Sequence, residues 1–187
     1  MGRLVVVLLW LFASVSHAKI GDRLIITIND TPYTQRQIEM YMTIKESLRK
    51  SDRVRLIRPV EWSVAVDVFT QDMIIFQESL RLGSFQPADQ VVDRFAGAVE
   101  QKIASDDHFR ENLKRLGVGS RDVRGALETV LRIDSFRKSK DRQDELAGEI
   151  RDKSARGKKS WFIDLEERAV IRLFREGKIY KSISPTL

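Results

Sequence analysis

Few residues in this chain of 187 residues could do chemistry. The chain has no cysteine, which excludes a thiolate nucleophile and a zinc–thiolate site. One histidine, His17, belongs to an apolar N-terminal segment, and the other, His108, lies near the start of a predicted helix. His108 could bind a ligand, but a surface or capping role is more common at such a position. No nucleophile elbow, H-E-x-x-H pair or P-loop is present.

Acidic residues occur in three adjacent pairs, Asp106-Asp107, Asp144-Glu145 and Glu166-Glu167. Neighbouring side chains on a helix diverge by about 100°, so these carboxylates would not converge on one reacting atom. They therefore form poor general acid/base pairs. We predict that the protein is not an enzyme, and we assign no catalytic residue, metal or cofactor.

Apolar and aromatic side chains are the remaining candidates for a functional site. Methionine is flexible and polarizable, which suits surfaces that bind varied partners. The candidates for a peptide-binding groove are Met40, Tyr41, Ile44, Trp62, Met73, Phe76 and Phe85. The alternative for each of them is an ordinary place in the hydrophobic core.

The first 18 residues, MGRLVVVLLWLFASVSHA, have the pattern of a secretory signal peptide. Arg3 precedes an apolar run at residues 4–12, which is shorter than the roughly 20 residues of a membrane-spanning helix. Ser16 and Ala18 provide small residues at a cleavage site. We predict export to the periplasm with cleavage after Ala18 and no stable membrane insertion; the alternative is an uncleaved anchor.

The net charge of +6 is mild, and basic and acidic residues alternate along the chain. This pattern favours solubility over nucleic-acid binding, and no motif suggests a nucleotide. Without disulfides, stability must come from a packed core, and the chain is long enough for a single domain.

The elements that would position the candidate residues are mainly helices. Residues 23–28 are rich in β-branched side chains and predict a strand, which a turn at residues 29–32 would end. Thr34 and Gln37 form a capping box for a helix that runs to about residue 50. Further helices are expected at residues 59–82, from 87 onwards, at 106–116 and from 120 onwards.

The helix at 59–82 contains the turn Met73-Ile74-Ile75-Phe76, which is apolar all round and therefore predicted to be central and buried. Residues 137–160 are strongly charged and predict a solvated helix or a flexible linker. A final helix from Trp161 leads into a predicted strand at residues 170–174.

In order and in motifs, these segments resemble SurA-type periplasmic chaperones. The similar stretches are LIITINDTPYTQRQIEMY, QDMIIFQESLRLGSFQPADQVVDRF, FRENLKRLGVGSRDVRGALETVLRIDSF and SWFIDLEERAVIRLF. Members of that family carry parvulin-type prolyl isomerase modules after the fifth helix. Here residues 137–160 occupy that interval, which is too short for such a module, so the resemblance implies no isomerase activity.

The resemblance implies a mainly α, single peptide-binding domain with a small two-stranded sheet. In this sheet a strand at residues 24–28 would pair with one at 170–174. The implied organisation is a signal peptide at 1–18, a helical core at 19–136, a charged linker or helix at 137–160, and a helix and strand at 161–187 that complete the core.

The implied function is that of a holdase, a chaperone that binds unfolded or partly folded exported polypeptides, such as outer-membrane protein precursors, without catalysis. Its partners would be nascent or unfolded envelope polypeptides. One alternative is an envelope adaptor that binds a single defined partner, and another is a prolyl isomerase with an unrecognised site.

Overall fold

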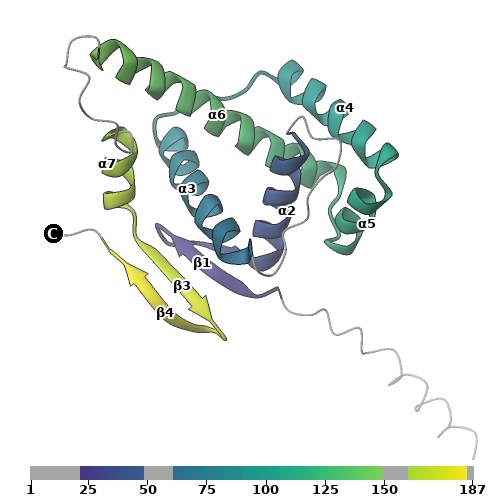
Figure 1. Ribbon diagram of the computed structural model, residues 1–187, viewed down its shortest axis with the longest axis horizontal. Helices are drawn as coiled ribbons and strands as arrows, with labels where there is room; N and C mark the ends of the chain where they lie inside the picture. Colours follow the sequence, from purple (N-terminus) through teal and green to yellow (C-terminus); the bar gives the residue numbers. More distant parts are fainter. Residues whose placement is uncertain (1–21, 49–60, 149–159, 185–187) are drawn as a thin grey trace, which may run out of the picture.

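A computed structural model describes residues 22–48, 61–148 and 160–184. Helices make up 69% of these residues, and a small antiparallel sheet covers one end of the helices (Figure 1). The predicted mainly α fold is confirmed. The predicted signal peptide at 1–18 lies outside the described residues, as does Pro59 at the expected start of the second helix.

The sheet begins with a hairpin that the sequence did not reveal. β1 (Leu24–Ile28) and β2 (Thr31–Thr34) are joined by Asn29 and Asp30, whose φ angles are 48° and 66°. Asparagine and aspartate adopt this left-handed conformation more readily than other residues with side chains. The turn therefore needs only two residues, and the prediction that it extends through residue 32 is wrong.

The two ends of the described chain meet in the sheet, whose strand order is β2-β1-β3-β4. β3 (Ile171–Arg175) is antiparallel to β1, with Ile26 opposite Leu173 and Ile28 opposite Ile171. The predicted pairing of the strand at residues 24–28 with the one predicted at 170–174 is thus confirmed. The sheet nevertheless has four strands rather than two, because β4 (Lys178–Ile183) follows β3 through a tight turn at Glu176-Gly177.

The helices form largely where capping and apolar periodicity predict them. α2 (Gln35–Ser47) starts with the capping box, in which the Thr34 side chain accepts from the Gln37 amide and the Gln37 side chain accepts from the Thr34 amide. α3 (Trp62–Arg81) ends one residue before Leu82 and two before Gly83. The next two helices are α4 (Asp89–Ser105) and α5 (Asp107–Arg115).

α6 (Ser120–Gly148) is a continuous helix of 29 residues, so residues 137–148 of the charged stretch are helical. Residues 149–159 lie outside the described part of the chain. Figure 1 shows α6 running from the side of α4 and α5 to the side of α7 (Ser160–Arg168). This helix therefore contacts both ends of the domain.

The buried side chains form two clusters. The first lies between the sheet and α2, α3, α6 and α7, and includes Ile26, Ile38, Phe69, Ile75 and Phe136. The second lies between α2, α4, α5 and α6, and includes Ile44, Val92, Val99, Phe109 and Leu127. Because α2 and α6 contribute to both clusters, their relative position is fixed from two sides.

Candidate functional site

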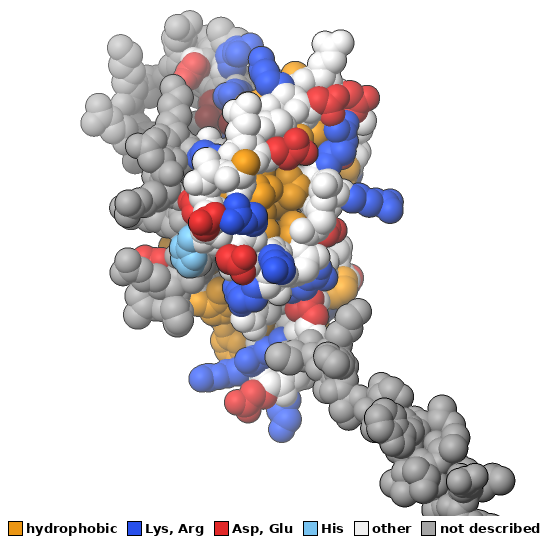
Figure 2. Space-filling view, turned by 90° about the vertical axis from the view of Figure 1, so that its right-hand side faces the viewer, with side chains coloured by type: hydrophobic (Ala, Val, Ile, Leu, Met, Phe, Trp, Pro, Cys, Tyr) orange, Lys and Arg blue, Asp and Glu red, His pale blue; other side chains and the backbone are white. Residues whose placement is uncertain are grey.

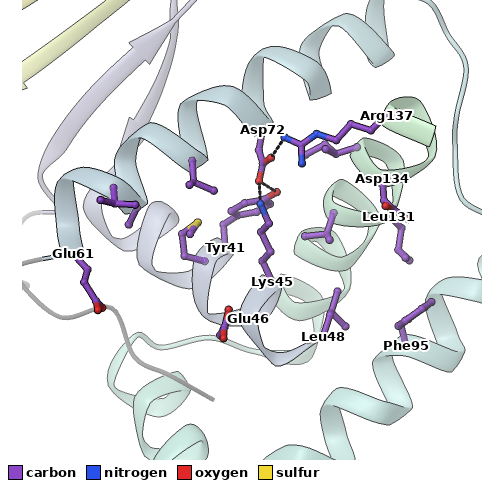
Figure 3. A pocket seen from close by; sticks show the side chains of 16 residues that line it. Tyr41, Lys45, Glu46, Leu48, Glu61, Asp72, Phe95, Leu131, Asp134 and Arg137 are labelled. Carbon is purple, nitrogen blue, oxygen red and sulfur yellow. Dashed lines mark hydrogen bonds and ion pairs between the residues drawn. The ribbon is translucent and has the colours of Figure 1, made fainter. Parts of the chain in front are cut away.

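An apolar groove with a volume of about 730 Å³ lies between α2, α3 and α6 (Figure 3). Pockets of roughly 300–1,000 Å³ are typical of ligand-binding sites. Its walls are formed mostly by aliphatic side chains, with Phe95 of α4 at one side. The apolar residues of the walls are Met42, Leu48, Val64, Ala65, Val68, Phe95, Val130, Leu131 and Ile133.

Helical spacing places these residues on facing surfaces. In α3, Val64, Val68 and Asp72 follow each other at intervals of four residues and so share one face. In α2, Tyr41 and Lys45 are four residues apart, and Leu48, which caps the C-terminal end of the helix, follows three residues later. α3 therefore contributes two valines to a wall and Asp72 to the floor, whereas α2 contributes Tyr41 and Lys45 to the floor, with Leu48 lining the groove after them.

The floor of the groove is a polar network centred on Asp72, whose side chain is 0% exposed. The Tyr41 hydroxyl donates to Oδ2 of Asp72 at 2.7 Å, and Nη2 of Arg137 donates to Oδ1 at 2.7 Å. Nζ of Lys45 forms an ion pair with Oδ2 of the same carboxylate. The three bonds come from α2 and α6, so one buried carboxylate joins both helices to α3 (Figure 3).

The electrostatics of this floor follow from burial. A buried carboxylate must be paired, because removing an ion from water costs several kcal/mol. Burial, and then the charge of Asp72, raise the pKa of Tyr41 well above its ordinary value, so its hydroxyl stays protonated as a donor. The side chains of Lys45 and Arg137 remain 30% and 38% exposed, so both cations reach the groove as well as Asp72.

Of the seven residues proposed from the sequence for a peptide-binding groove, the structure places Tyr41 at this groove. Ile44 and Met73 are buried in the core, and Met40 packs against the cluster that contains Ile44. The other three pack, partly buried, against the first cluster; they are Trp62, Phe76 and Phe85. None of these six is among the residues that line the groove.

Sequence reasoning missed the charged floor and the valines of α3. One signal was present: Asp72 directly precedes the apolar turn Met73–Phe76 that was predicted to be buried. A carboxylate in such a place requires a counterion, and a search for one among basic residues on other helices would have included Lys45 and Arg137. Which of the many basic residues meets Asp72 depends on helix packing.

Comparison with known proteins gives no identification. No protein-family model matches the chain, and neither a curated protein nor a solved structure gives a significant match. The resemblance to SurA-type chaperones therefore stays a prediction.

The other residues considered for chemistry lie at the surface or apart from each other. His108 is exposed on α5, one residue after Asp107. Within residues 22–48, 61–148 and 160–184, no group of three or more histidine, aspartate or glutamate side chains could hold a metal ion. In the same residues, no helix is long and apolar enough to cross a bilayer.

A second, smaller hollow of about 330 Å³ lies between α4, α5 and the start of α6. Its apolar residues include Ile103, Leu113 and Val123, and its rim carries Arg110 and Lys114. Figure 2 shows the side of the molecule where α4 and α5 lie, with apolar side chains visible between charged ones. The groove at Asp72 is more than twice as large and has the buried polar network, so it is the stronger candidate site.

Proposed function

We propose that this protein is a periplasmic holdase that binds unfolded or partly folded exported polypeptides in the groove between α2, α3 and α6. The observation that carries the proposal is the apolar groove itself, which three helices form beside a buried, charge-paired floor. The pattern of residues 1–18 and the resemblance to SurA-type chaperones support the periplasmic location and the type of client.

The groove would act by burying apolar side chains of an extended client. Burial contributes about 25 cal/mol per Å² of apolar surface, and ordering the client opposes it. Val64 is 61% exposed, so the outer wall of the groove offers apolar surface that a client could cover. Met42 lines the groove, and its flexible, polarizable side chain can adapt to clients of different shape. Affinity should therefore be modest and selectivity broad.

The test measures aggregation of a urea-unfolded outer-membrane protein on dilution, by light scattering, with increasing amounts of the mature protein. Two variants of α3 provide the comparison: Val64→Asp in the groove, and Leu80→Asp outside it, where the leucine is 49% exposed. Both place a carboxylate on an exposed apolar position of the same helix. Each variant is first checked for an unchanged far-UV circular dichroism spectrum.

We expect the wild type and Leu80→Asp to suppress aggregation equally. Val64→Asp should bind the client about tenfold more weakly, because burying a valine side chain contributes about 1.5 kcal/mol. Wild-type protein that leaves the aggregation of several unfolded clients unchanged would contradict the proposal. Equal activity of the two variants would show that the clients bind elsewhere.

A further inference from the structure

From the last strand of the sheet, we propose that β4 binds an extended, acidic segment of another polypeptide as an additional strand. In the complex this segment pairs with the free edge of β4, with carboxylates beside the two lysines of β4 and apolar side chains beside its two isoleucines. No residue of β4 lines the groove, so the proposal goes beyond the proposed function and does not depend on it.

The first support is the free backbone of β4. This strand ends the order β2-β1-β3-β4, so β3 pairs with one of its sides and, among the described residues, no strand pairs with the other (Figure 1). An edge strand presents a row of unpaired N–H and C=O groups, which an added strand can satisfy. The geometry of this edge therefore specifies the conformation of the partner, which must be extended.

The second support is apolar surface on the same strand. Six large apolar side chains are exposed among the described residues, and three of them belong to β4: Ile179 at 54%, Tyr180 at 60% and Ile183 at 42%. The register places Ile179 opposite Phe174 and Ile183 opposite Ile171. Because residues opposite each other share a face of the sheet, an added strand with apolar side chains extends these rows and covers exposed surface.

The third support is the charge of the hairpin formed by β3 and β4. Residues 171–184 contain four basic side chains and one acidic side chain, Glu176 in the turn. Arg172 is paired with an aspartate of the first hairpin, but no ion pair within the described residues involves Arg175, Lys178 or Lys181. The acidic residues of α7 precede β3, whereas Lys178 lies opposite Arg175 at the other end of the hairpin. An acidic strand therefore complements this edge.

The same charges argue against a second copy of the chain as the occupant. Two β4 strands side by side would bring together the lysines of both copies, and like charges across a strand pair are destabilising. The opposite edge of the sheet, β2, is only four residues long and contains Pro32, which has no backbone donor. Lysines at a sheet edge commonly prevent pairing between copies, yet they leave the edge open to a partner of opposite charge.

The test measures binding of short fluorescent peptides to the mature protein by fluorescence anisotropy. The first peptide alternates glutamate with valine, and the second has lysine in place of each glutamate. The third keeps the glutamates but carries a methyl group on every internal backbone amide, which removes the hydrogen-bond donors and leaves the side chains. Phosphatidylglycerol vesicles provide an anionic surface that cannot pair with a strand, and their binding is measured by co-sedimentation.

We expect the acidic peptide to bind about tenfold more tightly than the basic one, because both lysines of β4 change from a favourable to an unfavourable cross-strand pair. The methylated peptide should bind at least about tenfold more weakly than the acidic one, since it cannot donate to the edge. Equal binding of the acidic peptide and either of the others would overturn the proposal. Vesicles that bind as tightly as the acidic peptide would also overturn it, in favour of a membrane surface.

A reversal of charge on β4 tests the location of the site. The double variant Lys178→Glu/Lys181→Glu should prefer the basic peptide, and binding of that peptide would itself show that the edge is still formed. Lys114→Glu/Arg121→Glu is the matched control, because it changes the net charge equally at two exposed positions on α5 and α6. The control should keep the preference of the wild type.

The same preference in both double variants would overturn the assignment to β4. Sedimentation velocity of the wild type and of the β4 variant tests the remaining occupant, a second copy of the chain. A wild-type dimer that dissociates in Lys178→Glu/Lys181→Glu would assign the edge to that second copy and overturn the proposal.

Discussion

Replacing Asp72 with alanine tests whether the network at the floor joins the three helices. The carboxylate accepts from all three side chains, Tyr41, Lys45 and Arg137. The substitution is small, so it leaves the apolar walls of the groove in place. We expect a loss of unfolding free energy that is large for a single polar residue.

The magnitude follows from what each partner loses. The Tyr41 hydroxyl is buried and would lack an acceptor, which costs about 1–3 kcal/mol. Lys45 and Arg137 are partly exposed and can turn to water, so each of these pairs contributes only about 0–1 kcal/mol. The expected total is about 1–5 kcal/mol. Breaking a fully buried ion pair costs about 3–5 kcal/mol because it leaves a buried charge without a partner, whereas Lys45 and Arg137 can turn to water.

The assay is urea unfolding followed by far-UV circular dichroism, with the slope against denaturant checked for two-state behaviour. Asp134→Ala is the matched control, because its carboxylate is 53% exposed, lies on α6 and pairs with the exposed Lys138, so a loss below about 0.5 kcal/mol is expected. Adding Tyr41→Phe to Asp72→Ala should cost less than Tyr41→Phe alone, since it removes the stranded hydroxyl. A loss for Asp72→Ala no greater than that of Asp134→Ala would refute the reasoning.

Three further predictions follow. Burial raises the pKa of Tyr41 and of Tyr33 above 10.0, so the free energy of unfolding should be constant up to about pH 10 and fall at higher pH, where the unfolded state loses these protons more readily. Urea unfolding at stepped pH measures this, and Tyr41→Phe should reduce the loss of unfolding free energy per pH unit. Thr34→Ala should cost about 1 kcal/mol in the same assay because α2 loses its cap, and Thr34→Ser should restore most of it. Deleting residues 161–187 should abolish the thermal transition, because Leu165 and Ile171 are then missing from the core. Deleting residues 177–187 removes an exposed strand and should lower the melting temperature only modestly. Equal effects of the two deletions would contradict the role assigned to β3.

Local signals predicted the helices well, because caps and apolar periodicity act over a few residues. Thr34 and Gln37 are an example, since both partners of the capping box lie within one turn. The hairpins were harder. Pro32 argued for a turn, yet a proline is tolerated in β2 because this strand is at the edge of the sheet. β4 is exposed along its whole length and so lacks the apolar alternation that reveals a strand.

The groove could not be read from the sequence because the strongest apolar signals mark the core. Met73 and Ile44 fit a helix face well, and for that reason they are buried and cannot meet a ligand. Many residues that line the groove are only partly buried, such as Met42 and Leu48, and Val64 is exposed. The floor combines Asp72 with Arg137, 65 positions later, and only the packing of α6 on α3 brings them together.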